Sequence, residues 1–127
     1  MKKLLSVFII LFLSTPCFGE WKKITKNLSG NTTFYLDFET IRKVDGYHYV
    51  WMLGDYIKPS KFGDLSVKVY FQVDCKLFRF KILNDIYHTG PMGTGKISHV
   101  GTEPEKEWTY PSPGSVNDIL FKDLCRF

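Results

Sequence analysis

The segment from 65 to 73 alternates between apolar and polar side chains more regularly than any other part of the chain. A two-residue period places successive side chains on opposite faces of a β-strand. The segment therefore predicts a long strand with one face against the core. Its expected inward residues are Leu65, Val67, Val69, Phe71 and Val73, and its expected outward residues are Ser66, Lys68 and Gln72.

Alternation of the same period predicts strands over 21–25, 32–37, 47–53, 78–82 and, more weakly, 95–100. The strand that begins at 78 can continue towards His88. Residues 38–42 indicate either one helical turn or an irregular crossing, and Asp45-Gly46 indicates a turn. The connections are too short for crossover helices, so we expect an antiparallel sheet.

The C-terminal segment changes to a helical period. Val116, Ile119, Leu120 and Leu124 are apolar at the spacing of one helix face. Ser115 precedes them, and the carboxylate of Asp118 follows three residues later, as in a capping box at the positive end of a helix. The pattern predicts a helix that starts at Ser115 and packs on the sheet.

Residues 1–19 have the layout of a secretory signal peptide. Lys2 and Lys3 give a basic start, Leu4 to Leu13 form an apolar run, and mostly small residues lead to a cleavage site after Gly19. The alternative is a retained membrane anchor. The run is shorter than the roughly 20 residues that a spanning helix needs, which favours the signal peptide.

The place of cleavage decides the location of the mature chain. Cleavage after Gly19 leaves residues 20–127, which suffice for one domain, in the periplasm or secreted. The alternative is a lipoprotein with Cys17 as its lipidated first residue, at the outer membrane or cell surface. Pro16 disfavours lipidation, because a small flexible residue normally stands before such a cysteine.

Removal of residues 1–19 leaves two cysteines, Cys75 and Cys125, in an oxidising compartment where paired thiols persist. A bridge closing this loop of about fifty residues is worth roughly 4 kcal/mol on the chain-entropy model. Two free buried thiols are the alternative. The predicted fold is α+β: a single antiparallel β-sheet meander of about six strands with a C-terminal helix pinned by one disulfide.

Charge and motifs argue against several functions. The net charge of +4 falls by two when Lys2 and Lys3 leave, so the chain lacks the basic excess of a nucleic-acid-binding protein. Residues 90–96 match the core of a phosphate-binding loop. However, Ile97 stands where the magnesium-binding hydroxyl belongs, and a strand pattern follows instead of a helix. These glycines are therefore expected to form a hairpin turn.

The residue pattern predicts neither a cofactor nor a metal site. His48, His88 and His99 are not spaced as ligands of one metal ion. The sequence has no nucleophile elbow, and no reduced cysteine remains to pair with a histidine. We therefore expect no catalytic residues and a protein that is not an enzyme.

Aromatic residues make up 17% of the chain, which is much for one small core. Residues 47–53 are apolar at both phases of the alternation, so this strand is either covered on both sides or presents one face to a partner. Surplus rings at a sheet face or loop rim mark a protein contact or a homodimer interface. The candidate binding-face aromatics are Tyr47, Tyr49, Trp51, Tyr56, Trp108 and Tyr110. A core rich in rings is the alternative.

Several short motifs occur in a characteristic order over nearly all of residues 20–127. They are Glu20-Trp21-Lys22-Lys23-Ile24, Phe34-Tyr35-Leu36-Asp37, Val50-Trp51-Met52-Leu53 with Asp55-Tyr56, Val73-Asp74-Cys75, Met92-Gly93 with Gly95-Lys96, Trp108, and Pro113-Gly114-Ser115 to Cys125. With these motifs the chain resembles the surface-adhesin protein E family, small exported domains of Gram-negative bacteria.

The resemblance implies an antiparallel sheet with a C-terminal helix, a Cys75–Cys125 bridge and possible dimerisation. It also implies an adhesin that binds host matrix proteins such as vitronectin and laminin, and it carries over no catalytic residue. Our first hypothesis is an exported non-enzymatic binding domain that contacts a protein partner. The alternative is a periplasmic structural or envelope-maintenance protein that acts as a homodimer.

Overall fold

A computed structural model describes residues 20–127 of the chain. The predicted signal peptide, its cleavage after Gly19 and the lipidation of Cys17 therefore lie outside the described residues. Among the described residues, no helix has the length and apolar character needed to cross a membrane.

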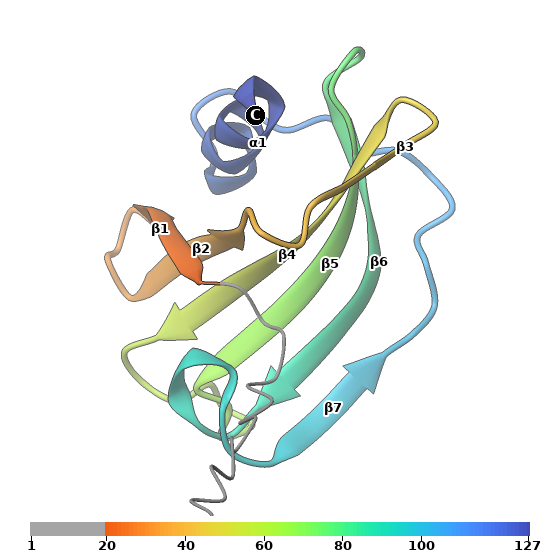
Figure 1. Cartoon of the computed structure of the whole chain (residues 1–127). Coiled ribbons are helices and arrows are strands. Elements are labelled where there is room, and N and C mark those ends of the chain that lie inside the picture. The colour runs from red at the N-terminus through yellow and green to blue at the C-terminus, as the bar shows by residue number, and fades with distance from the viewer. Residues whose placement is uncertain (1–19) are drawn as a thin grey trace, which may run out of the picture.

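The described residues form one antiparallel sheet and one α-helix, which confirms the predicted α+β fold (Figure 1). The elements are β1 Trp21–Lys26, β2 Thr32–Asp37, β3 Arg42–Val44, β4 Tyr47–Tyr56, β5 Ser66–Asp74, β6 Arg79–His88, β7 Ile97–Gly101 and α1 Val116–Arg126. A short 3₁₀ turn, η1, spans Pro91–Gly93. Neighbouring strands follow the order β1-β2-β4-β5-β6-β7, so the path is a meander.

Strand β3 is the element that the sequence did not predict. β2 pairs with the second half of β4, and β3 pairs with its first three residues, so both lie along the same edge of β4. Between them the chain leaves the sheet at residues 38–41. The carboxylate of Asp37 accepts hydrogen bonds from the Glu39 N–H at 3.1 Å and from the Thr40 hydroxyl at 2.8 Å. This turn is the irregular crossing that the sequence indicated.

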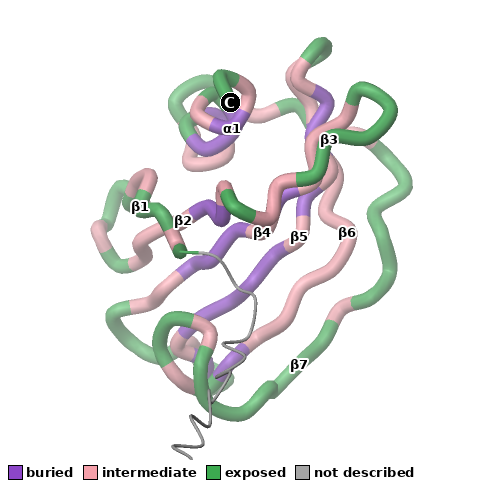
Figure 2. Tube along the Cα trace, viewed as in Figure 1, coloured by how far each residue is buried: buried purple, intermediate pink, exposed green. Residues whose placement is uncertain are grey.

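The core lies between α1 and one face of the sheet (Figure 2). Leu120, Phe121 and Leu124 of the helix are fully buried. The Phe121 ring lies 5.1 Å from Phe71 and 5.0 Å from Phe80, measured between centroids. We call this side of the sheet the helix face.

The start of α1 has the predicted cap. The Ser115 hydroxyl accepts a hydrogen bond from the Asp118 N–H at 3.2 Å. The Asp118 carboxylate accepts from the Gly114 N–H at 2.9 Å and from Lys122 at 3.1 Å. The bond from Gly114, followed by that from Lys122, lowers the pKa of Asp118.

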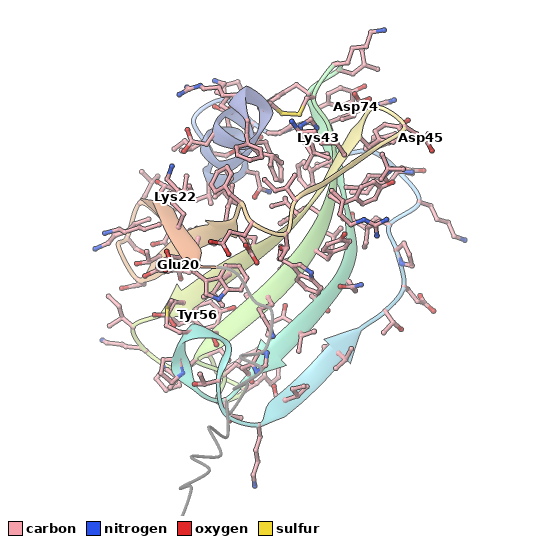
Figure 3. All side chains as sticks on the ribbon, in the orientation of Figure 1. Glu20, Lys22, Lys43, Asp45, Tyr56 and Asp74 are labelled. Atoms are coloured by element: carbon pink, nitrogen blue, oxygen red, sulfur yellow. A yellow bond between two sulfur atoms is a disulfide. The ribbon has the colours of Figure 1, made fainter. Side chains whose placement is uncertain are left out.

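The predicted disulfide joins Cys75, in the β5–β6 turn, to Cys125 in the last turn of α1. The two Cα atoms are 5.6 Å apart, and the bridge appears as the yellow bond in Figure 3. It fixes the end of the helix to the end of the sheet at which β5 turns into β6 (Figure 1).

Ser66 and Lys68 of β5 lie on the face opposite α1, as expected, but they are buried rather than exposed to solvent. The β6–β7 connection, which contains η1, folds over Ser66. The Ser66 hydroxyl donates to the Gly90 carbonyl at 2.7 Å and accepts from the Gly93 N–H at 2.9 Å. This connection contains the glycines that resemble a phosphate-binding loop, and the strand β7 follows it as predicted.

Candidate functional site

The face of the sheet opposite α1 carries a row of aromatic rings. Tyr47, Tyr49 and Trp51 alternate along β4 with core residues such as Val50, so their side chains project away from the helix. Tyr70 of β5 is the register partner of Trp51 and lies on the same face. We call the rings of Tyr47, Tyr49, Trp51, Tyr70 and Trp108 the aromatic face.

These rings contact one another across strands. The centroid distances are 4.7 Å for Trp51–Tyr70 and 6.2 Å for Tyr49–Tyr70. The Gln72 side-chain amide donates to the Tyr49 hydroxyl at 3.1 Å. All five rings keep part of their surface accessible to solvent. The row is therefore ordered before any partner binds, which lowers the entropic cost of binding.

Trp108 extends the row from outside the sheet strands. Its ring lies 5.5 Å from Tyr47. The neighbouring residue Thr109 forms an antiparallel bridge with Phe80 of β6, and this bridge holds the segment against the sheet. The Trp108 ring also has two cations close to it, the Arg79 guanidinium at 4.5 Å and the Lys81 ammonium at 4.6 Å.

The surroundings of the rings are mainly basic. Arg42 on β3 is the register partner of Tyr49, and Lys81 pairs with Gln72, so both lie on the aromatic face. Arg79 forms an ion pair with Asp74 at 2.9 Å. Burial alone would raise the pKa of Asp74, but the bonds from Arg79, Leu77 and Lys76 outweigh it and lower this pKa. Burial raises the pKa of Tyr70, and the charge of Arg42 opposes that rise.

The structure brings together four of the six aromatic residues that the sequence singled out. Tyr47, Tyr49, Trp51 and Trp108 lie on the aromatic face. Tyr56 packs against the core on the helix face, at the end of β4 far from Lys43 and Asp45 (Figure 3). Tyr110 is 62% exposed, and the hydrogen bond with Asp74, followed by one with the Tyr110 hydroxyl, raises the pKa of Arg79.

Sequence reasoning missed Tyr70 and the basic residues Arg42, Arg79 and Lys81. Tyr70 shares its alternation phase with Lys68 and Gln72, both expected to face outward, so that phase was the signal that could have identified it. Arg42 needs β3 to reach this face. No local pattern predicted that three-residue strand.

The three histidines occupy separate environments. His48 Nδ1 lies 3.5 Å from the sulfur of Cys75, His99 packs beside Tyr87, and His88 is only 5% exposed. In the described part of the chain, no group of three or more histidine, cysteine or carboxylate side chains is placed to hold a metal ion.

His88 makes the stability of the fold sensitive to pH. Both of its ring nitrogens are buried, with no hydrogen-bond partner among the described residues. Burial, and then the charge of Lys68, lowers the pKa of His88 below 6.5. The folded state therefore binds fewer protons than the unfolded state as the pH falls below about 6.5, and stability is lost there at up to about 1.4 kcal/mol per pH unit.

The measurement is urea unfolding of the protein between pH 7.5 and 5.5. The variant His88→Leu is expected to lose less stability over this interval than the parent. A matched control is Val100→Ala, a change at an exposed position without a titratable group, which should lose as much as the parent. Equal losses in His88→Leu and the parent would show that His88 does not titrate with unfolding.

Comparisons with known proteins give one family and one fold. A family model described as surface-adhesin protein E matches residues 21–126. A solved structure of Haemophilus influenzae protein E is similar with a TM-score of 0.63 and 16% identity, covering 88% of this chain and 90% of that one. A second crystal form of that protein gives a TM-score of 0.62 and 15% identity, covering 88% of this chain and 94% of that one.

A structure of protein E from non-typeable Haemophilus influenzae gives a TM-score of 0.58 and 18% identity, covering 90% of this chain and 82% of that one. No curated protein matches the chain. At these identities the solved structures establish a shared fold, whereas the family model covers almost the whole described chain.

Proposed function

The chain belongs to the surface-adhesin protein E family, and from this premise we propose that it is an exported, non-enzymatic domain that binds a protein partner through the aromatic face. Family membership supports an adhesin-like protein of the cell surface. Host extracellular matrix proteins are the partner class that the family suggests.

The observation that carries this proposal is the combination of partly exposed rings with basic side chains on the face that α1 leaves open. Tyrosine, tryptophan and arginine supply most of the binding energy in protein interfaces. Arg42 and Lys81 lie beside the rings. This chemistry favours a partner surface that presents carboxylates next to apolar side chains.

The same charges argue against a symmetric dimer formed through this face. Two copies placed face to face would bring Arg42 and Lys81 of each close to those of the other, which is unfavourable unless salt screens them. A homodimer that acts in the envelope is therefore the second candidate. Sedimentation at low and high salt distinguishes the partner-binding domain from the homodimer. A tight dimer at low salt, where the repulsion between these charges is strongest, would favour the homodimer.

The binding test uses immobilised vitronectin and laminin with the purified protein in solution. The double variant Arg42→Glu/Lys81→Glu is expected to bind at least tenfold more weakly than the parent, because it reverses two charges beside the rings. The matched control Lys22→Glu/Lys58→Glu reverses one exposed charge that pairs with the helix face, at Leu36, and one in the β4–β5 loop, and should bind as the parent does.

Two results would contradict the proposal. The first is equal binding by the charge-reversed variant and the parent, which would place the contact elsewhere. The second is a failure of the parent to bind either matrix protein or any acidic protein in the same format. Thermal unfolding of both variants shows whether a loss of binding comes from a loss of the fold.

Location is tested by the intact, non-reduced mass of the protein recovered from cell envelopes. A chain that starts at Glu20 supports export with cleavage after Gly19. A chain that starts at Cys17 and carries acyl groups supports tethering at the outer membrane, which favours the adhesin form of the proposal. A chain that retains Met1 would contradict the signal peptide.

A further inference from the structure

A hollow of about 510 Å³ opens on the helix face of the sheet, away from the aromatic face. Its lining consists of Phe62, Asp64, Asp85, Tyr87, Ser98 and His99. Asp85 and Tyr87 are register partners of the core residues Val69 and Val67, which places them on the helix face. The volume is typical of a site for a small ligand or a single side chain.

Aromatic rings form part of the wall and rim. The rings of Tyr87 and His99 lie 5.8 Å apart, and Phe62 is 77% exposed. Lys61 is not a lining residue, but its ammonium lies 5.0 Å from the centre of the Phe62 ring. The rim ring therefore already attracts a cation, as the faces of aromatic rings do.

The charged lining residues of the hollow are two carboxylates, Asp64 and Asp85. Asp64 is 4% exposed and accepts a hydrogen bond from the Ser98 hydroxyl. In the described part of the chain the ion pairs involve Asp74, Asp118 and Asp123, so neither pocket carboxylate belongs to one.

Asp85 is the second carboxylate of the lining, and it lies against β7. Its Oδ1 is buried and has no hydrogen-bond partner among the described residues. Gly101 lies directly opposite on β7, and a Cβ at that position would overlap the Asp85 carboxylate. Because Gly101 has no side chain, the Asp85 carboxylate can occupy this space.

We propose that this hollow binds the guanidinium group of an arginine side chain presented by a partner polypeptide. A guanidinium stacks on aromatic rings and donates several hydrogen bonds to carboxylates, so it matches both parts of the lining. Burial, followed by the charges of Asp85 and Asp64, raises the pKa of Tyr87, which agrees with a negative potential in the hollow. The site is separate from the aromatic face. It binds a cationic group, whereas the basic side chains of the aromatic face favour carboxylates.

The probe is N-acetyl-arginine methylamide, which carries the side chain without terminal charges. It is titrated into the isotopically labelled protein, and the backbone amide resonances are followed by NMR. We expect shifts at Asp64, Asp85, Tyr87 and His99. The neutral isostere N-acetyl-citrulline methylamide is expected to bind at least tenfold more weakly, and the lysine analogue to lie between the two.

Variants test the residues. Asp85→Asn is expected to weaken binding of the arginine probe about tenfold, and Phe62→Ala, at an exposed position, about threefold. The matched control is Asp45→Asn, an exposed carboxylate in the β3–β4 turn with a positive φ that asparagine tolerates. It should bind as the parent does, and so should Arg42→Glu/Lys81→Glu.

Equal affinity for the arginine and citrulline probes would overturn the proposal, as would shifts confined to other residues. Unchanged binding in both Asp85→Asn and Phe62→Ala would also overturn it. Since the aromatic-face variant retains this site, failure here is distinguishable from failure of the proposed function.

Discussion

The double variant Cys75→Ser/Cys125→Ser is expected to unfold with a free energy about 4 kcal/mol below that of the parent. The bridge closes a loop of sequence separation 50, and the loss of this constraint increases the entropy of the unfolded chain. The midpoint of thermal unfolding should fall by on the order of 20 °C. Changing both cysteines avoids leaving a free thiol beside His48.

The measurement is urea unfolding at pH 7 under non-reducing conditions. The parent with dithiothreitol is the matched control, and it should lose about as much stability as the double variant. In addition, dithiothreitol should not change the stability of the double variant itself. A parent that unfolds at the same urea concentration with and without reductant would contradict a stabilising bridge.

The variant Phe121→Ala is expected to destabilise the fold by about 3 to 5 kcal/mol. The Phe121 side chain is fully buried and contacts the rings of both Phe71 and Phe80. Its removal loses apolar burial and leaves a cavity between α1 and the sheet. Urea unfolding of the oxidised protein measures the effect.

The same helix offers a matched control. Ile119 is 40% exposed, so Ile119→Ala should change stability by less than about 1 kcal/mol. Comparable losses in the two variants would mean that α1 does not pack on the sheet through Phe121. A loss of the unfolding transition in Phe121→Ala alone would agree with the expected effect.

The fold was predictable wherever one periodic signal covered a whole element. Alternation identified β2 with its observed bounds, and Ser115 with Asp118 identified the start of α1. β3 was missed because a three-residue exposed strand contains too few residues to show a period. The burial of Ser66 and Lys68 was not predictable, because alternation gives the face of a side chain but not what covers that face, here the β6–β7 connection.

The sites were predictable to different degrees. The rings of β4 share one alternation phase, so a single strand indicated most of the aromatic face. The arginine site draws on the β4–β5 loop, β6 and β7, and its carboxylates at 64 and 85 meet only through strand pairing. Residues so far apart in the chain form no local pattern, and therefore the hollow could not be predicted from the sequence.

The disulfide also determines how the domain responds to mechanical force. A pull between residue 20 and Arg126 runs along β1 to β5 and crosses the sulfur bridge to the end of α1. The loop that contains β6, β7 and most of α1 carries no load, because the force passes through the bridge. Extension under load therefore releases only the residues up to Cys75, at about 3.5 Å each. An oxidised domain that is anchored at one end and gripped at the other keeps the rest of its chain out of the stretched path.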